Sequence, residues 1–159
     1  MSYITAVTAT GDRAAFVAGG STVKDVITGL GASSCFGAQL VMGGDNAGML
    51  QVQYRTETAE QAMACSEGAV GNADVQAYMQ SFNAQIQRRS LLKLNGERGD
   101  MSGTYGMGSL ISGGPIEDGA LQASLDNAWG IVSDAAVSYT HLRAHETRGN
   151  LVCRLLLEK

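Results

Sequence analysis

The hydrophobic pattern of the chain begins with a strand that is followed by an amphipathic helix. Residues 3–10 (YITAVTAT) are mostly β-branched or aromatic and end at Gly11, which predicts a strand. Asp12 is a residue type that caps helices, so we expect a helix to follow it directly. Apolar residues of this helix recur at spacings of three or four, or multiples of these, and form one face: Phe16, Val23, Ile27 and Leu30.

Two glycines weaken the middle of this helix. Gly19 and Gly20 each cost roughly 1 kcal/mol relative to alanine in a helix interior. The helix could therefore start later, with Ser21 as its cap. In either case we expect Gly29 and Gly31 to end it.

A glycine-rich turn separates the next two apolar segments. Residues 36–43 and 49–56 are strand-like, and residues 44–48 (GDNAG) tolerate a positive φ, which together predict a hairpin. An even-length loop places Gln39, Val41, Leu50, Val52 and Tyr54 on one face. It places Ala38, Leu40, Met42, Met49, Gln51 and Gln53 on the other. An odd-length loop would exchange the partners, but neither face becomes polar, so we expect both faces of the sheet to be covered.

A second helical region follows the hairpin. Residues 58–61 (TAEQ) form a capping box, and Gly68 and Gly71 are expected to interrupt the helix that starts there. Asn72 can cap a second segment. That segment has an apolar stripe, which we interpret as core packing: Val75, Met79, Phe82 and Ile86.

The region ends with two arginines and a short apolar segment. We expect Arg88 and Arg89 to lie at the end of this helix, where cations favour the helix dipole. Residues 90–95 (SLLKLN) then predict a short strand that Gly96 closes. The element order is β-α-β-β-α-β, which is typical of a ferredoxin-like α+β sandwich.

The pattern starts again after residue 96. Residues 104–112 are strand-like, and a helix is predicted from Asp118, with an apolar face formed by Leu121, Leu125, Trp129 and Val132. We therefore expect one ferredoxin-like unit over residues 1–96 and the start of a second, incomplete unit over residues 97–136.

The last 23 residues have a different interpretation. Residues 137–159 (VSYTHLRAHETRGNLVCRLLLEK) resemble the translation of an adapter used in transposon-type sequencing libraries, with Arg148 and Gly149 falling on its variable index. We therefore expect this segment to be a non-native tail and the native product to be truncated near residue 135. The alternative is a genuine C-terminal strand and helix. Both histidines, His141 and His145, lie in the tail, so their helical spacing is not interpreted as a metal site.

Charge and cysteine usage narrow the class of protein. Residues 1–136 contain seven Lys and Arg against thirteen Asp and Glu, a formal net charge of −6. This acidity argues against nucleic acid or an anionic membrane surface as a partner. No signal peptide or membrane-spanning run is apparent, so we expect a cytoplasmic protein. Cys35 and Cys65 are far apart without companion ligands, which favours two reduced, buried thiols.

A family resemblance rests on the hairpin sequence and its flanks. The sequence VMGGDNAG at residues 41–48, the strands on either side and the Ala-rich helix after them resemble the dimeric α+β-barrel superfamily, in particular bacterial members with two tandem ferredoxin-like halves. The resemblance covers roughly residues 3–95. It implies two sheets packed face to face, from two chains or two halves, with a pocket between sheet and helices. The superfamily includes cofactor-free monooxygenases, haem-associated enzymes, lyases and ligand binders.

Candidate chemistry is sparse. The GG-x-x-x-G at residues 43–48 precedes a strand, whereas a dinucleotide fingerprint precedes a helix, so tight-turn geometry is the better interpretation. Before residue 137 there is no histidine base, activated nucleophile or metal-ligand cluster, so we assign no catalytic residue, no metal site and no cofactor. If a pocket exists, we expect its polar lining to come from Tyr3, Gln51, Gln53, Tyr54 and Arg55.

Two hypotheses about function remain. The first is a small-molecule-binding or structural α+β-barrel module that pairs as a homodimer or with the missing half of its own chain. The alternative is a cofactor-free oxygenase or lyase of the same superfamily. A sheet face without a covering layer would be too apolar to remain exposed to solvent. We therefore expect residues 1–135 to self-associate.

Overall fold

The computed structural model describes residues 2–42, 44–97 and 117–139. The chain divides into two compact units, Met1–Leu94 and Asn95–Lys159. Each unit is described separately below.

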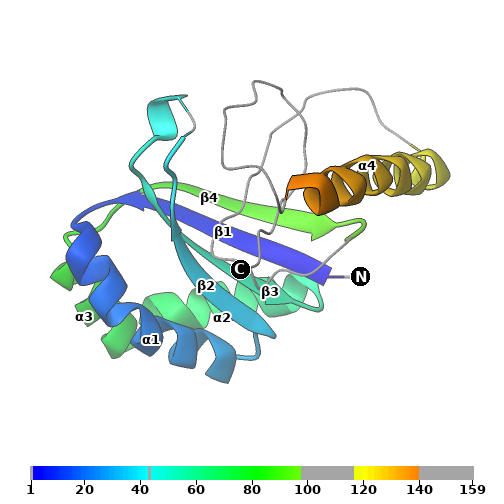
Figure 1. The fold of residues 1–159 in the computed structure, drawn as a ribbon. Coiled ribbons are helices and arrows are strands. Elements are labelled where there is room, and N and C mark those ends of the chain that lie inside the picture. Colours follow the sequence, from blue (N-terminus) through cyan, green and yellow to red (C-terminus); the bar gives the residue numbers. More distant parts are fainter. Residues whose placement is uncertain (1, 43, 98–116, 140–159) are drawn as a thin grey trace. The chain divides into compact units, whose positions relative to one another are not determined.

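The first unit is an α+β structure with one four-stranded antiparallel sheet (Figure 1). Its elements in chain order are β1 (Ser2–Thr10), α1 (Arg13–Gly29), β2 (Ser34–Gln39), the 3-10 turn η1 (Gly44–Asn46), β3 (Leu50–Thr56), α2 (Ala59–Gly71), α3 (Ala73–Ser81) and β4 (Gln85–Leu94). The strand order is β2-β3-β1-β4. Helices α1, α2 and α3 cover one face of the sheet. This arrangement is compatible with a ferredoxin-like fold.

The β2–β3 hairpin has the even-length loop of the first alternative. Gln39 pairs with Leu50, and the ladder continues one step further through a hydrogen bond from Leu40 N to Met49 O. Because paired residues share a face, Leu50, Val52 and Tyr54 lie together on one face, as predicted. This is the face that the helices cover. Gly44 and Gly48 at the tip have φ of 60° and 87°, which explains the glycines there. Strand β2 starts at Ser34 and ends at Gln39, earlier than predicted.

Helix α1 starts directly after Asp12 and not at Ser21. The Asp12 carboxylate accepts a hydrogen bond from Ala15 N (2.8 Å) and caps the helix. The helix runs through Gly19 and Gly20 because tertiary packing compensates for their low propensity. A Cβ atom at Gly19 would lie 2.3 Å from the Tyr78 ring, so this glycine allows α3 to approach α1 closely.

Helices α2 and α3 begin at the predicted caps. Thr58 Oγ1 accepts from Gln61 N (3.0 Å), and Gln61 Nε2 donates to Gly31 O (2.7 Å), which joins the start of α2 to the end of α1. Asn72 caps α3. Gly68 does not interrupt α2, contrary to the prediction, because it packs against Leu30, where a Cβ would lie 2.8 Å from a methyl carbon.

Strand β4 is longer than predicted. It spans Gln85–Leu94, so Ile86 belongs to the strand and not to a helical stripe, and Arg88 and Arg89 do not lie at a helix end. The helix ends earlier because Asn83 adopts a positive φ of 53° directly after the Phe82 cap. Pairing with β1 then determines the strand conformation, because Gln and Arg are not among the residues that favour strands by themselves.

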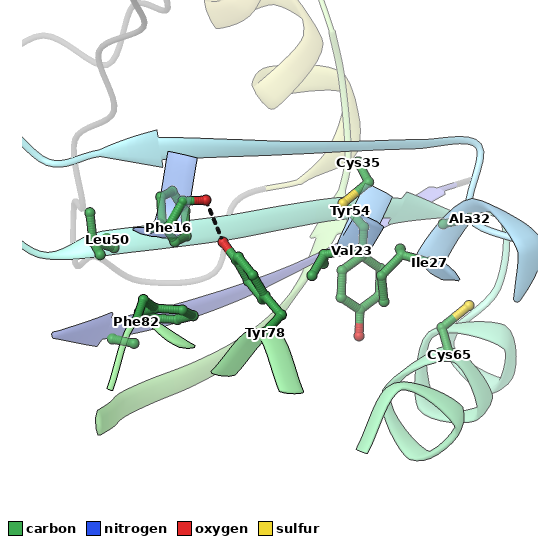
Figure 2. Packing of buried hydrophobic residues seen from close by; sticks show 11 residues of the cluster. Phe16, Val23, Ile27, Ala32, Cys35, Leu50, Tyr54, Cys65, Tyr78 and Phe82 are labelled. Atoms are coloured by element: carbon green, nitrogen blue, oxygen red, sulfur yellow. Dashed lines mark hydrogen bonds between the residues drawn. The ribbon is translucent and has the colours of Figure 1, made fainter. Parts of the chain in front are cut away.

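The core of the first unit lies between the sheet and the three helices. Leu50 and Cys65 are almost fully buried, at 2 % and 0 % exposure. Phe16, Tyr78 and Phe82 form an aromatic cluster with ring centroids 4.8–6.1 Å apart (Figure 2). The buried cluster also includes Val23, Ile27 and Tyr54.

The described part of the second unit is mainly helix α4 (Asp118–Tyr139). It confirms the helix predicted from Asp118. The Leu125 side chain packs at Gly96, and Gln122 Nε2 donates to Asn95 O (2.8 Å). The predicted strand at 104–112 lies outside the described residues, so the proposed repeat stays a prediction. Of the tail at 137–159, residues 140–159 also lie outside them.

Candidate functional site

A cavity of about 100 Å³ lies between the sheet and the helices of the first unit. This is well above the roughly 10–15 Å³ that one water molecule needs. Its walls come from β1, β3, β4 and all three helices, and most are aliphatic or aromatic side chains. Four lining residues have polar side-chain atoms: Tyr54, Ser66, Tyr78 and Arg89.

The polar atoms inside the cavity are already partnered. Tyr54 Oη lies 2.6 Å from Ser66 Oγ, and Ser66 Oγ donates to Ala62 O (2.9 Å). Because serine has one hydroxyl proton, the Tyr54 hydroxyl is the donor to Ser66. The hydroxyl proton of Tyr54 is therefore used in the hydrogen bond to Ser66, and the Tyr54 oxygen can only accept a further hydrogen bond.

The hydroxyl proton of Tyr78 is also used in a hydrogen bond within the protein. Its hydroxyl donates to Phe16 O (2.9 Å), a bond that joins α3 to α1 (Figure 2). Burial raises the pKa of Tyr78 to about 12, with a smaller contribution from nearby Cys35. The hydroxyl thus stays protonated at neutral pH and offers an acceptor, not a donor, to the cavity.

The exposed members of the lining mark where the cavity meets solvent. Val70 on α2 is 52 % exposed, and Arg89 on β4 is exposed as well. Arg89 pairs with Val7 of β1, so it lies on the sheet face that the helices cover. Among the described residues no side chain forms a hydrogen bond or ion pair with its guanidinium. Among the described lining residues, the exposed ones are therefore an apolar side chain, Val70, and a cation, Arg89.

The predicted ligand-binding residues are divided between the two faces of the sheet. Tyr54 lines the cavity. Tyr3 lies on the same face but is not part of the lining. Gln51, Gln53 and Arg55 alternate with Tyr54 along β3 and lie on the opposite face. The structure thus does not bring the five residues together, and their role in ligand binding stays a prediction.

The opposite face has its own polar network. Gln51 Nε2 donates to Thr8 Oγ1 (3.0 Å) and Gln53 Nε2 donates to Gln51 Oε1. Arg55 Nε donates to Ser2 Oγ (3.1 Å). These side chains hold each other across β1 and β3. The three helices of the first unit cover the other face (Figure 1), so the expected covering of this face stays a prediction.

Ser66, Tyr78 and Arg89 were not predicted as site residues. Ser66 and Tyr78 lie on helices, and neither is marked by a local motif. Arg89 was assigned to a helix end because Ile86 continued the apolar stripe of the preceding helix. The strand signal was weak, since the bulge in β4 opposite Thr8 and Ala9 breaks the alternation of the strand. The sequence signal for a site at this position was a cationic residue within a segment that can pair as a strand.

Both described cysteines are free and buried, as expected. Burial raises the pKa of the Cys35 thiol to about 11, although nearby Lys24 opposes the shift. Burial also raises the pKa of Cys65, whose Sγ lies 3.1 Å from Leu30 O. Both therefore stay protonated at neutral pH and are poor nucleophiles.

The described residues contain no group of three or more His, Cys, Asp or Glu side chains that could hold a metal ion. Within the same residues, no helix has the length and apolarity needed to cross a membrane. No protein-family model matches the chain, and no curated protein matches it either.

Proposed function

We propose that the first unit is a small-molecule-binding module that holds an apolar group in the cavity between its sheet and its helices. The observation that carries the proposal is the cavity itself, about 100 Å³ in size and lined mainly by apolar side chains. An apolar ligand that fills a cavity of this kind gains favourable contacts with the apolar side chains of its walls.

The location of the cavity agrees with the resemblance to the dimeric α+β-barrel superfamily. That resemblance implies a pocket between sheet and helices, and the β2-β3-β1-β4 sheet with three helices on one face supports it. We therefore favour a ferredoxin-like unit of this type that binds a ligand. Burial keeps the Tyr78 hydroxyl of the cavity and the Cys35 thiol of the core protonated at neutral pH, because it raises the pKa of both groups, which supports binding over nucleophilic or acid–base chemistry.

The proposal is tested with benzene, a neutral apolar probe, added to the full-length chain. Amide and methyl NMR signals of residues around the cavity should shift in a saturable way. The matched variants are A69L and A64L, because Ala69 lines the cavity whereas Ala64 is exposed on the same helix. A69L fills the cavity and should abolish the shifts, and A64L should leave them unchanged.

Two results would overturn the proposal. One is an absence of localised shifts in the wild-type chain. The other is equal benzene binding by A69L and the wild type, which would place the probe elsewhere. The unfolding temperature of A69L, measured in parallel, shows whether the variant is folded.

A further inference from the structure

Among the described residues that line the cavity, the side chain with free hydrogen-bond donors is Arg89, which is exposed to solvent. Inside, the hydroxyl protons of Tyr54 and Tyr78 are committed to Ser66 and to Phe16 O. Their oxygens would face a ligand with lone pairs, so an anionic group there would meet no donor and no compensating charge. An anion at depth is therefore disfavoured, whereas an apolar group is not.

Arg89 supplies a positive charge where the cavity meets solvent. It lies in the lining, it is exposed, and no described side chain is bound to its guanidinium. A guanidinium presents donors in a planar fork that matches a carboxylate. Val70 is another exposed residue of the lining, and its side chain is apolar.

We propose that the cavity binds a small monocarboxylate, with its apolar chain or ring inside and its carboxylate at Arg89. This inference rests on the proposed function, since it names the ligand class of the same cavity. The size of the cavity favours a short aliphatic chain or a single ring over a long lipid chain.

The test uses hexanoate and 1-hexanol on the full-length chain, with NMR shifts to measure affinity. Both probes have the same chain length, and the carboxylate is the difference. Hexanoate should bind more tightly at low ionic strength, and added salt should reduce its advantage. Acetate, which has the carboxylate without the chain, should not shift the cavity signals.

Arg89→Gln should weaken hexanoate binding about two- to fivefold, a modest effect because the ion pair is partly exposed to solvent. The same variant should leave the affinity for 1-hexanol unchanged. The matched control is Arg88→Gln, which removes the same charge from the neighbouring residue. Arg88 lies on the opposite sheet face, where its Nε donates to Ser90 Oγ (3.0 Å). This control should leave hexanoate binding unchanged.

The outcomes separate the two proposals. If neither probe shifts the cavity signals, the small-molecule function itself is wrong. If 1-hexanol binds but hexanoate binds no better, or if Arg88→Gln weakens hexanoate as much as Arg89→Gln, the assignment of a carboxylate to Arg89 is wrong. A shift with acetate alone equal to that with hexanoate would also overturn the proposal, because the cavity would then play no part.

Discussion

At the scale of single residues, Thr5 has a buried hydroxyl that forms no hydrogen bond within the described part of the chain. A buried polar group without a partner destabilises the folded state. Thr5→Val keeps the shape of the side chain and removes this group, so it should raise the free energy of unfolding by about 1 kcal/mol. Urea denaturation measures the change.

Thr8 provides the matched control in the same strand. It is equally buried, but its Oγ1 accepts a hydrogen bond from Gln51 Nε2. Thr8→Val should therefore lower the free energy of unfolding, since the amide of Gln51 loses its acceptor. Equal effects of the two substitutions would show that the Thr5 hydroxyl has an unrecognised partner.

Cys35 should make the stability of the fold depend on alkaline pH. Burial raises the pKa of its thiol in the folded state to about 11, above the ordinary value of 9.0 that applies in the unfolded chain. Above pH 9 the unfolded chain loses a proton that the folded chain keeps, so stability is full below pH 9 and falls as the pH rises towards 11. Denaturation across this range should show the decrease.

Cys35→Ala identifies the contribution of this thiol. The variant should be less stable at neutral pH because it loses packing, but its stability should fall less steeply between pH 9 and 11. An unchanged slope would assign the alkaline decrease to Tyr78 and Cys65, whose pKa values are raised as well.

At the scale of elements, Gly19 controls how closely α1 and α3 pack. A methyl group at this position would lie 2.3 Å from the Tyr78 ring, whereas one at Gly20 would meet nothing within 4 Å. Gly19→Ala should therefore lower the free energy of unfolding by about 1–3 kcal/mol through overpacking. Gly20→Ala should raise it by about 0.5–1 kcal/mol through its higher helix propensity. Thermal unfolding of both variants checks the contrast.

Helix caps and turns could be predicted from the sequence because their signals are local. Asp12, Thr58 and Asn72 each lie beside the backbone groups that they cap, and the glycines at 44 and 48 mark the hairpin tip. Strand β4 could not be predicted with its correct start. Its residues are mostly exposed on both faces, so it lacks alternation, and only pairing with the distant β1 determines its conformation.

At the scale of the whole molecule, the first unit should fold without the second. The sheet, three helices and buried cluster all belong to Met1–Leu94. A chain that ends after residue 97 should therefore unfold in one cooperative transition and keep the NMR dispersion of a packed core. Loss of that cooperativity would mean that the second unit is needed for stability.

The candidate site could be predicted only in part because it is assembled across the chain. Tyr54 was identified from its strand. Ser66, Tyr78 and Arg89 come from three other elements and line the same cavity as Tyr54 only in the folded unit. Alternation along β3 separates Tyr54 from Gln51, Gln53 and Arg55, but which of the two faces the helices cover (Figure 1) could not be predicted from the sequence.

The central place of β1 in the sheet has a consequence for the order of folding. During synthesis β1 leaves the ribosome before the other strands of this unit, but its neighbours β3 and β4 span Leu50–Thr56 and Gln85–Leu94. The first strand therefore stays without either partner until more than half of the unit has been made. Long-range pairing of this kind slows folding and leaves an unpaired strand available to other chains. Chaperones that bind nascent chains would accordingly act on this unit during the interval before β3 emerges.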